Sequence, residues 1–107
     1  TINVIYRHSC VTILFFQTNV ASCAKHYAGD GGTTKGIDEN NTMVSYEELQ
    51  NIHIAAYYAA IANSVSTVMI SYSSWNGVKM SANEYLITTV LKEQMGFQVN
   101  LKGLVVF

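Results

Sequence analysis

Proline and charged side chains are scarce in this sequence. None of the 107 residues is proline, whereas a typical soluble domain has about 5% proline. Only 12% of the residues are charged, against roughly 25% in such a domain. Because a free-standing domain needs a charged surface and often places proline in its loops, both shortages favour a segment from the interior of a larger protein. Six basic and seven acidic residues leave a net charge of -1 without a basic run, so we expect neither nucleic acid nor a membrane as a partner.

Long apolar runs and a cysteine framework are also missing. The run at residues 11–16 is far shorter than the roughly 20 residues that cross a bilayer, so we expect no membrane-spanning segment. Arg7 before that run imitates a signal peptide only faintly, because the chain opens on Thr1 without a convincing cleavage site, and we expect no signal peptide here. Cys10 and Cys23 could pair, but two buried thiols are the simpler interpretation.

Two helices are predicted by their first residues. Ser45 and Ser81 each stand three residues before a glutamate, the capping-box pattern in which both side chains bind each other's backbone N–H groups. Apolar residues at helical spacing extend the first helix to about Asn63 and the second towards Gly96, where the glycine favours a stop. The residues expected on the buried faces are Leu49, Ile52, Ala56 and Ala60 in the first helix, and Leu86, Val90 and Leu91 in the second.

Short β-branched segments flank these helices. Residues 65–72 and 101–107 are nearly continuous in apolar character, as strands buried on both faces are, and residues 20–26 and 11–16 are further candidates. The alternation of strands and helices predicts the α/β class, with a parallel sheet and right-handed crossovers. Such units could form a small open domain or be consecutive βα units of a partial (β/α)₈ TIM barrel, which is about 250 residues long when complete. The low charge favours the barrel.

Polar and aromatic residues gather where two predicted strands end. Ligands of parallel α/β folds bind at the carboxyl ends of strands, so residues 25–32, residues 71–77 and whatever follows Phe107 should meet on one rim. Lys25 and His26 offer donors and an acceptor suited to ring hydroxyls, although a surface lysine beside a core histidine would look the same in sequence. Since neighbours on a regular strand face opposite ways, a shared site requires a bulge or a non-proline cis peptide here, which we predict.

Other motifs on this rim are less specific. Glycines around Asp30 allow tight turns, but no phosphate-binding pattern accompanies them. Tyr72 and Trp75 among serines are typical of a carbohydrate cleft, and equally of structural aromatic residues. Asn40 begins an N-glycosylation sequon, which matters only in a secreted protein. The three histidines lack metal-ligand spacing, and we predict neither a metal nor a cofactor.

Three longer motifs carry more information together than apart. They are Ala-Lys-His-Tyr with Gly-Asp-Gly-Gly-Thr at residues 24–33, Gly-Ile-Asp-Glu-Asn-Asn-Thr at residues 36–42, and Ser-Thr-Val-Met-Ile-Ser-Tyr-Ser-Ser-Trp-Asn-Gly-Val-Lys-Met at residues 66–80. In this order they resemble glycoside hydrolase family 3, particularly plant β-glucan exohydrolases and β-glucosidases. The match covers about residues 20–107, while residues 1–19 diverge. The resemblance implies that residues 1–107 are a fragment of an N-terminal (β/α)₈ barrel domain from a secreted, cell-wall enzyme.

The resemblance also implies an activity, the exo-acting hydrolysis of β-glucans or β-glucoside oligosaccharides with retention of configuration. Retention needs a nucleophile and an acid/base carboxyl about 5–5.5 Å apart. Residues 103–107 match the start of the family motif that carries the nucleophile, so the nucleophile is expected just after Phe107 and the acid/base in a second domain. By position, the residues implied in substrate binding are Lys25, His26 and Tyr72, and those implied near the catalytic centre are Asp30, Glu39 and Trp75.

Several positions depart from the family pattern. Asp38 stands where asparagine is usual, Ala55 replaces a proline, Ser81 replaces a histidine, and residues 98–100 resemble an insertion. Two functional interpretations follow. The chain is part of a working glycosidase that needs the rest of the barrel and the second domain, or it is a non-catalytic truncated or pseudogene product that binds sugars weakly at most. In both cases we expect no turnover by these residues alone.

Overall fold

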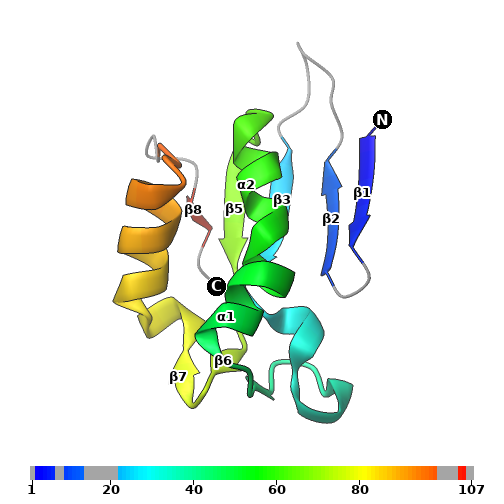
Figure 1. Cartoon of the computed structure of the whole chain (residues 1–107), viewed down its shortest axis with the longest axis vertical. Coiled ribbons are helices and arrows are strands. Elements are labelled where there is room, and N and C mark those ends of the chain that lie inside the picture. The colour runs from blue at the N-terminus through cyan, green and yellow to red at the C-terminus, as the bar shows by residue number, and fades with distance from the viewer. Residues whose placement is uncertain (1, 7–8, 14–21, 99–103, 106–107) are drawn as a thin grey trace.

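A three-stranded parallel sheet organises the chain. The computed structural model describes residues 2–6, 9–13, 22–98 and 104–105. Within them the sheet has the order β3-β5-β8, with all strands parallel, and a small second sheet has the order β4-β6-β7 (Figure 1). The strands are β1 (Ile2–Tyr6), β2 (Ser9–Ile13), β3 (Cys23–Tyr27), β4 (Asn41–Thr42), β5 (Thr67–Ile70), β6 (Ser74–Trp75), β7 (Val78–Lys79) and β8 (Leu104–Val105).

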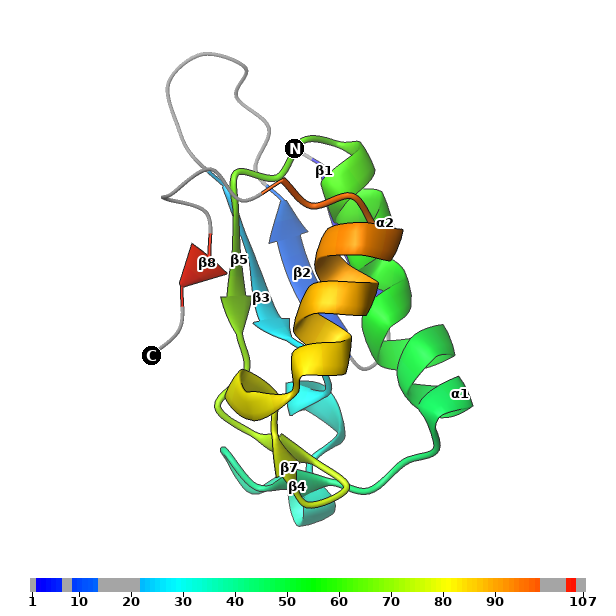
Figure 2. The ribbon, with the colours of Figure 1, turned by 90° about the vertical axis from the view of Figure 1, so that its left-hand side faces the viewer.

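Both long helical segments cover the same face of this sheet (Figure 2). The helical elements are α1 (Tyr46–Glu48), the π-helical turn Leu49–Ile54, α2 (Ala55–Ala62), the π-helix Tyr85–Gln94, and the 3₁₀ turns Asp30–Gly32, Thr34–Gly36 and Met80–Ala82. The core lies between them and the strands, and its fully buried members include Ala24, Tyr27, Leu49, Ile54, Ala60, Val68, Met80, Leu86, Val90 and Leu91. The predicted alternation of parallel strands and helices is confirmed, so the chain has an α/β fold.

The first helix begins and ends as predicted. Ser45 accepts a hydrogen bond from the backbone N–H of Glu48, whose carboxylate accepts from the Ser45 N–H, both at 3.1 Å. The helix continues through the π-helical turn and α2 to a cap at Asn63. The prediction that Ile52 is buried is wrong, since this side chain is 42% exposed. A π-helical turn bonds residues five apart, which rotates the buried face onto Ile54.

The second helix begins later than predicted. Ser81 lies in the 3₁₀ turn Met80–Ala82 and caps nothing; the side chain of Asn83 instead accepts the Leu86 N–H at 3.1 Å. The capping box at Ser81 is therefore wrong, because a turn separates the serine from the helix. The end is close to the prediction: the helix stops at Gln94, and Gly96 adopts a φ of 70°.

The strands are shorter in the structure than predicted, and one of them pairs with a different partner. Residues 20–21, 101–103 and 106–107 of the expected strands lie outside the described residues, as do residues 14–16. Instead of joining a parallel sheet, β2 pairs antiparallel with β1, a strand that we did not predict. Two residues separate these strands, and a parallel crossover needs a dozen or more. The hairpin lies beside β3 (Figure 1).

The prediction of two buried thiols is wrong for Cys23, which is exposed at the start of β3. Cys23 precedes the fully buried Ala24, and neighbouring residues on a strand face opposite ways, which explains that exposure. The Cys10 side chain lies outside the part of the chain whose side chains the structure describes.

Candidate functional site

The carboxyl end of β3 presents His26 through an irregular backbone. The Lys25–His26 peptide is cis, and the pairing of β3 with β5 shifts register between Lys25 and Tyr27, which confirms the predicted distortion. His26 Nδ1 lies 2.7 Å from Asp30 Oδ2, and both side chains are a little over one third exposed. An ionised carboxylate only accepts hydrogen bonds, so His26 donates from Nδ1, and its Nε2 can serve a second partner.

The end of β5 presents Tyr72 between two buried serines. The Ser71 N–H donates to the Tyr27 carbonyl at 2.6 Å, which ties the ends of β5 and β3 together. The Ser71 and Ser73 hydroxyls are 2.7 Å apart, and the Ser73 N–H donates to the Ser71 hydroxyl at 3.2 Å. Both serines are buried while Tyr72 is 55% exposed. The turn therefore fixes the backbone and leaves the tyrosine ring at the surface.

A loop brings two more carboxylates to this end of the sheet. Asp38 and Glu39 are exposed, and Glu39 adopts a φ of 61°, a left-handed conformation that is uncommon outside glycine. The Asn40 N–H donates to the Ile37 carbonyl at 3.2 Å and closes the turn around both acids. Thr42, fully buried at the end of the loop, donates to the Gly29 carbonyl. The loop is thus anchored next to the Asp30 turn.

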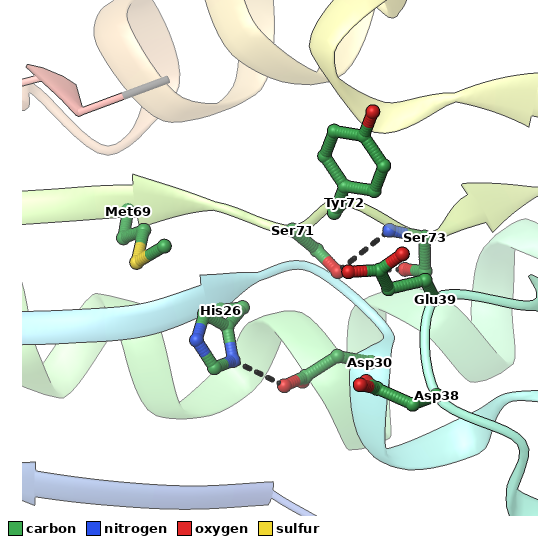
Figure 3. A pocket seen from close by; sticks show the side chains of 8 residues that line it. All are labelled: His26, Asp30, Asp38, Glu39, Met69, Ser71, Tyr72 and Ser73. Carbon is green, nitrogen blue, oxygen red and sulfur yellow. Dashed lines mark hydrogen bonds and ion pairs between the residues drawn. The ribbon is translucent and has the colours of Figure 1, made fainter. Parts of the chain in front are cut away.

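These three segments enclose a pocket of about 430 Å³ (Figure 3). Its lining residues are His26, Asp30, Asp38, Glu39, Met69, Ser71, Tyr72 and Ser73. His26 and Asp30 point toward one another, while the Tyr72 ring lies at the opposite side of the group and points away from them (Figure 3). Carboxylates accept hydrogen bonds and serine hydroxyls both donate and accept, so the pocket suits a neutral ligand rich in hydroxyls.

Four of the six predicted site residues line this pocket and two do not. His26, Asp30, Glu39 and Tyr72 line it, whereas Lys25 is exposed on β3 outside the lining. The roles assigned to all six remain predictions. Sequence reasoning gave no role to the buried serines on either side of Tyr72 or to Met69. Small polar residues directly after a buried strand are the signal that could have found the serines.

Trp75 lies on β6 of the small sheet, outside the pocket lining. Its indole N–H donates to the Val44 carbonyl at 2.9 Å, and its half-buried ring packs against the core. The Tyr46 ring lies 6.1 Å from it, and a hydrogen bond with Tyr85 raises the pKa of Tyr46 to about 12. These contacts favour a structural role for Trp75 in the folded chain.

The sequon at Asn40 is built into the same loop. The Asn40 side-chain carbonyl accepts the Asn41 N–H at 2.8 Å, and the sequon threonine, Thr42, is fully buried. Glycosylation of Asn40 remains a prediction, and it would require access to Thr42 before folding.

The described residues contain no group of three or more histidine, cysteine, aspartate and glutamate side chains arranged to hold a metal ion. Nor is any helix in that part of the chain both long and apolar enough to cross a membrane.

Solved structures of bacterial glycosidases resemble the chain. An exo-1,3/1,4-β-glucanase from a Pseudoalteromonas species has a TM-score of 0.76 and 42% identity over 83% of this chain and 11% of its own. A β-glucosidase from Listeria innocua has a TM-score of 0.74 and 30% identity over 81% of this chain and 12% of its own. Structures of that β-glucosidase include complexes with glucose and, for a D270A mutant, with laminaribiose.

A curated relative and a family model agree with these structures. A β-xylosidase from Formosa agariphila is 27% identical over 84 residues, which are 78% of this chain and 12% of the relative. The chain thus spans only a small part of the proteins it matches. The model of the glycosyl hydrolase family 3 N-terminal domain matches residues 9–106. With nearly the whole chain matched, the protein belongs to glycosyl hydrolase family 3, within its N-terminal domain.

Proposed function

We propose that this chain is part of a retaining, exo-acting β-glucosidase or β-glucan exohydrolase and forms one wall of the site that holds the terminal glucose. The pocket at the carboxyl ends of β3 and β5 carries this proposal. Its carboxylates, imidazole and serine hydroxyls match the many hydroxyls of a sugar ring, and relatives of similar fold are named β-glucanases and β-glucosidases. We further propose that the parent protein is secreted.

The architecture that we propose is a partial (β/α)₈ barrel. Three parallel strands with helices on one face are what consecutive βα units of such a barrel provide. In barrels the ligand site lies at the carboxyl ends of the strands, which is where this pocket lies. The pocket then becomes one sector of a larger site completed by other units.

The catalytic carboxylates are proposed to lie outside this chain. A retaining glycosidase needs two carboxyl groups about 5–5.5 Å apart, one as nucleophile and one as acid and base. Parallel pairing of β8 with β5, Met69 opposite Val105, directs the end of β8 to the edge that carries Ser71 and Tyr72. An aspartate just after Phe107 would suit the nucleophile, and a second domain would supply the acid/base. Asp30 already binds His26, so we propose that Asp30 positions the His26 ring.

Binding and turnover test the two halves of this proposal separately. We expect the purified chain to bind glucose or laminaribiose in an NMR titration and to leave an aryl β-glucoside unhydrolysed. His26→Ala should weaken binding about 10-fold or more, because it removes a hydrogen-bonding ring from the pocket, whereas Lys35→Ala on an exposed loop should not. Equal binding of an α-linked disaccharide would contradict the assignment, and hydrolysis abolished by Lys25→Ala would contradict the proposed inactivity.

The coding sequence past Phe107 separates the enzyme from the non-catalytic alternative. An in-frame aspartate followed by a domain with an acidic residue supports the enzyme, and the longer protein should then hydrolyse aryl β-glucosides with retention. Assays with aryl β-xyloside in parallel test the sugar class, since a β-xylosidase is among the relatives. An immediate stop codon would support a truncated product instead.

A further inference from the structure

Tyr72 combines high exposure with a rigid backbone. Its side chain is 55% exposed at the pocket edge, while the serines on both sides of it are buried and hydrogen-bonded to each other. A tyrosine with this exposure is expected to exchange between rotamers unless another residue holds its ring. A mobile ring at a ligand site costs binding free energy, because the ligand must order it.

One ammonium group contacts Tyr72 in two ways. Lys79 Nζ donates to the Tyr72 carbonyl at 3.0 Å and also lies 4.7 Å from the centre of the Tyr72 ring. The second distance is within the roughly 6 Å at which a cation is attracted to the face of an aromatic ring. A single side chain therefore connects the fixed backbone of Tyr72 to its exposed ring.

Lys79 is held in turn by a two-residue hairpin. Lys79 on β7 pairs with Ser74 on β6, and the connecting Asn76 and Gly77 have φ values of 46° and 85°, as an Asn-Gly type I′ turn requires. The Gly77 N–H donates to the Asn41 side chain at 2.8 Å, which fixes the tip of the hairpin to the loop of the two pocket acids. Backbone pairing thus fixes the main chain of Lys79, from which the side chain reaches Tyr72.

We propose that Lys79 is a positioning residue that holds the Tyr72 ring at the pocket edge and so strengthens binding of a β-linked sugar. Lys79 itself does not line the pocket and acts through Tyr72. The effect on sugar binding rests on the proposed function, whereas the effect on the orientation of Tyr72 does not.

A comparison of variants in two backgrounds tests the effect on binding. Lys79→Ala should weaken laminaribiose binding about 3- to 10-fold, and Lys79→Arg, which keeps a cation and its donors, should restore most of it. Lys92→Ala, a lysine on the π-helix away from the pocket, is the matched control and should have no effect. In a Tyr72→Ala background, Lys79→Ala should change the affinity no further. An equal loss in that background would overturn the proposal.

NMR of the ring tests the positioning without any sugar. In the unliganded protein the ε-methylene protons of Lys79 should be shifted upfield by the Tyr72 ring and return to ordinary values in Tyr72→Ala. Lys79→Ala should leave the core resonances in place while Tyr72 averages over several rotamers. If no variant binds any β-glucoside but these signals behave as stated, the proposed function fails and the positioning stands. A Tyr72 ring equally ordered in Lys79→Ala would overturn the positioning itself.

Discussion

His26 Nδ1 and Asp30 Oδ2 lie 2.7 Å apart at the end of β3, across four residues of chain. This hydrogen-bonded pair is partly exposed, and even charged pairs with such exposure contribute little to stability, about 0–1 kcal/mol. Its consequence is chemical, because the carboxylate selects the imidazole tautomer that carries its proton on Nδ1. The pocket then meets the Nε2 atom in a defined state.

Asp30→Ala should remove the preference of His26 for this tautomer. We expect the ¹⁵N shifts of neutral His26 to move toward the Nε2–H tautomer, which an unconstrained imidazole prefers, with a stability change below about 1 kcal/mol. Two-dimensional ¹H–¹⁵N spectra of the ring at alkaline pH measure this directly. Asp38→Ala changes another carboxylate of the same pocket and should leave the His26 tautomer alone. The same ring spectrum in Asp30→Ala and the wild type would show that Asp30 does not select the tautomer.

Features determined by local sequence could be predicted. The helix from Ser45 to Asn63 follows from one cap and a repeated apolar spacing, and the alternation of β3, β5 and β8 with helices follows from the change of periodicity along the chain, whereas the β1–β2 hairpin was not predicted. The irregular backbone at Lys25–His26 was predicted on the premise that both side chains serve one site; the distortion is present, although only His26 lines the pocket. In each case a few adjacent residues contain the whole argument.

Features without a recognisable local sequence signal could not be predicted. Ile52 is exposed because a π-helical turn, which has no sequence signal here, rotates the helix surface. Trp75 lies outside the pocket because its indole binds the Val44 carbonyl 31 residues earlier. Lys79 has no motif that distinguishes it from other surface lysines, and only the hairpin pairing brings it to Tyr72.

The two serines predicted as helix caps should differ in their effect on stability. Ser45→Ala removes a hydrogen-bonded capping box and should lower the free energy of unfolding by about 1 kcal/mol. Ser81→Ala removes no cap and should stay within about 0.5 kcal/mol of the wild type. Asn83→Ala should cost about as much as Ser45→Ala, because Asn83 bonds the first turn of the second helix. Urea denaturation of the three variants measures the differences, and equal losses at Ser45 and Ser81 would contradict the assignment.

Ser64 offers a site for stabilisation. It follows α2 with a φ of 61°, and the N–H of Val65 donates to the Ala60 carbonyl at 3.1 Å, as in a Schellman helix end. Since glycine adopts this conformation without the steric cost of a Cβ atom, Ser64→Gly should raise the free energy of unfolding by about 1 kcal/mol. Ala62→Gly, two residues earlier but within α2, should lower it by about the same amount. A loss of stability in both variants would contradict the role of the left-handed conformation.

Two buried tyrosines should make the fold sensitive to alkaline pH. The rings of Tyr27 and Tyr57 meet edge to face with centres 5.0 Å apart, and the Tyr27 hydroxyl donates to the Leu86 carbonyl at 2.8 Å. Burial is the main cause that raises the pKa of both phenols well above the ordinary 10.0. Neighbouring tyrosines raise the pKa of Tyr27 further, and the Asp30 charge and then Tyr27 raise that of Tyr57 further.

Above pH 10 the unfolded chain therefore releases protons that the folded chain retains. Stability should be fully present below pH 10 and fall by about 1.4 kcal/mol per pH unit for each tyrosine as the pH rises further. Tyr27→Phe should cost about 1–2 kcal/mol at neutral pH, because the Leu86 carbonyl loses its partner, and should reduce this slope by about 1.4 kcal/mol per pH unit. Urea denaturation between pH 9 and pH 11.5 measures both effects. Ser45→Ala, destabilising through a cap and not a phenol, is the control and should lower stability with the wild-type slope; an unchanged slope in Tyr27→Phe would mean that the Tyr27 phenol ionises alike in the folded and unfolded chains.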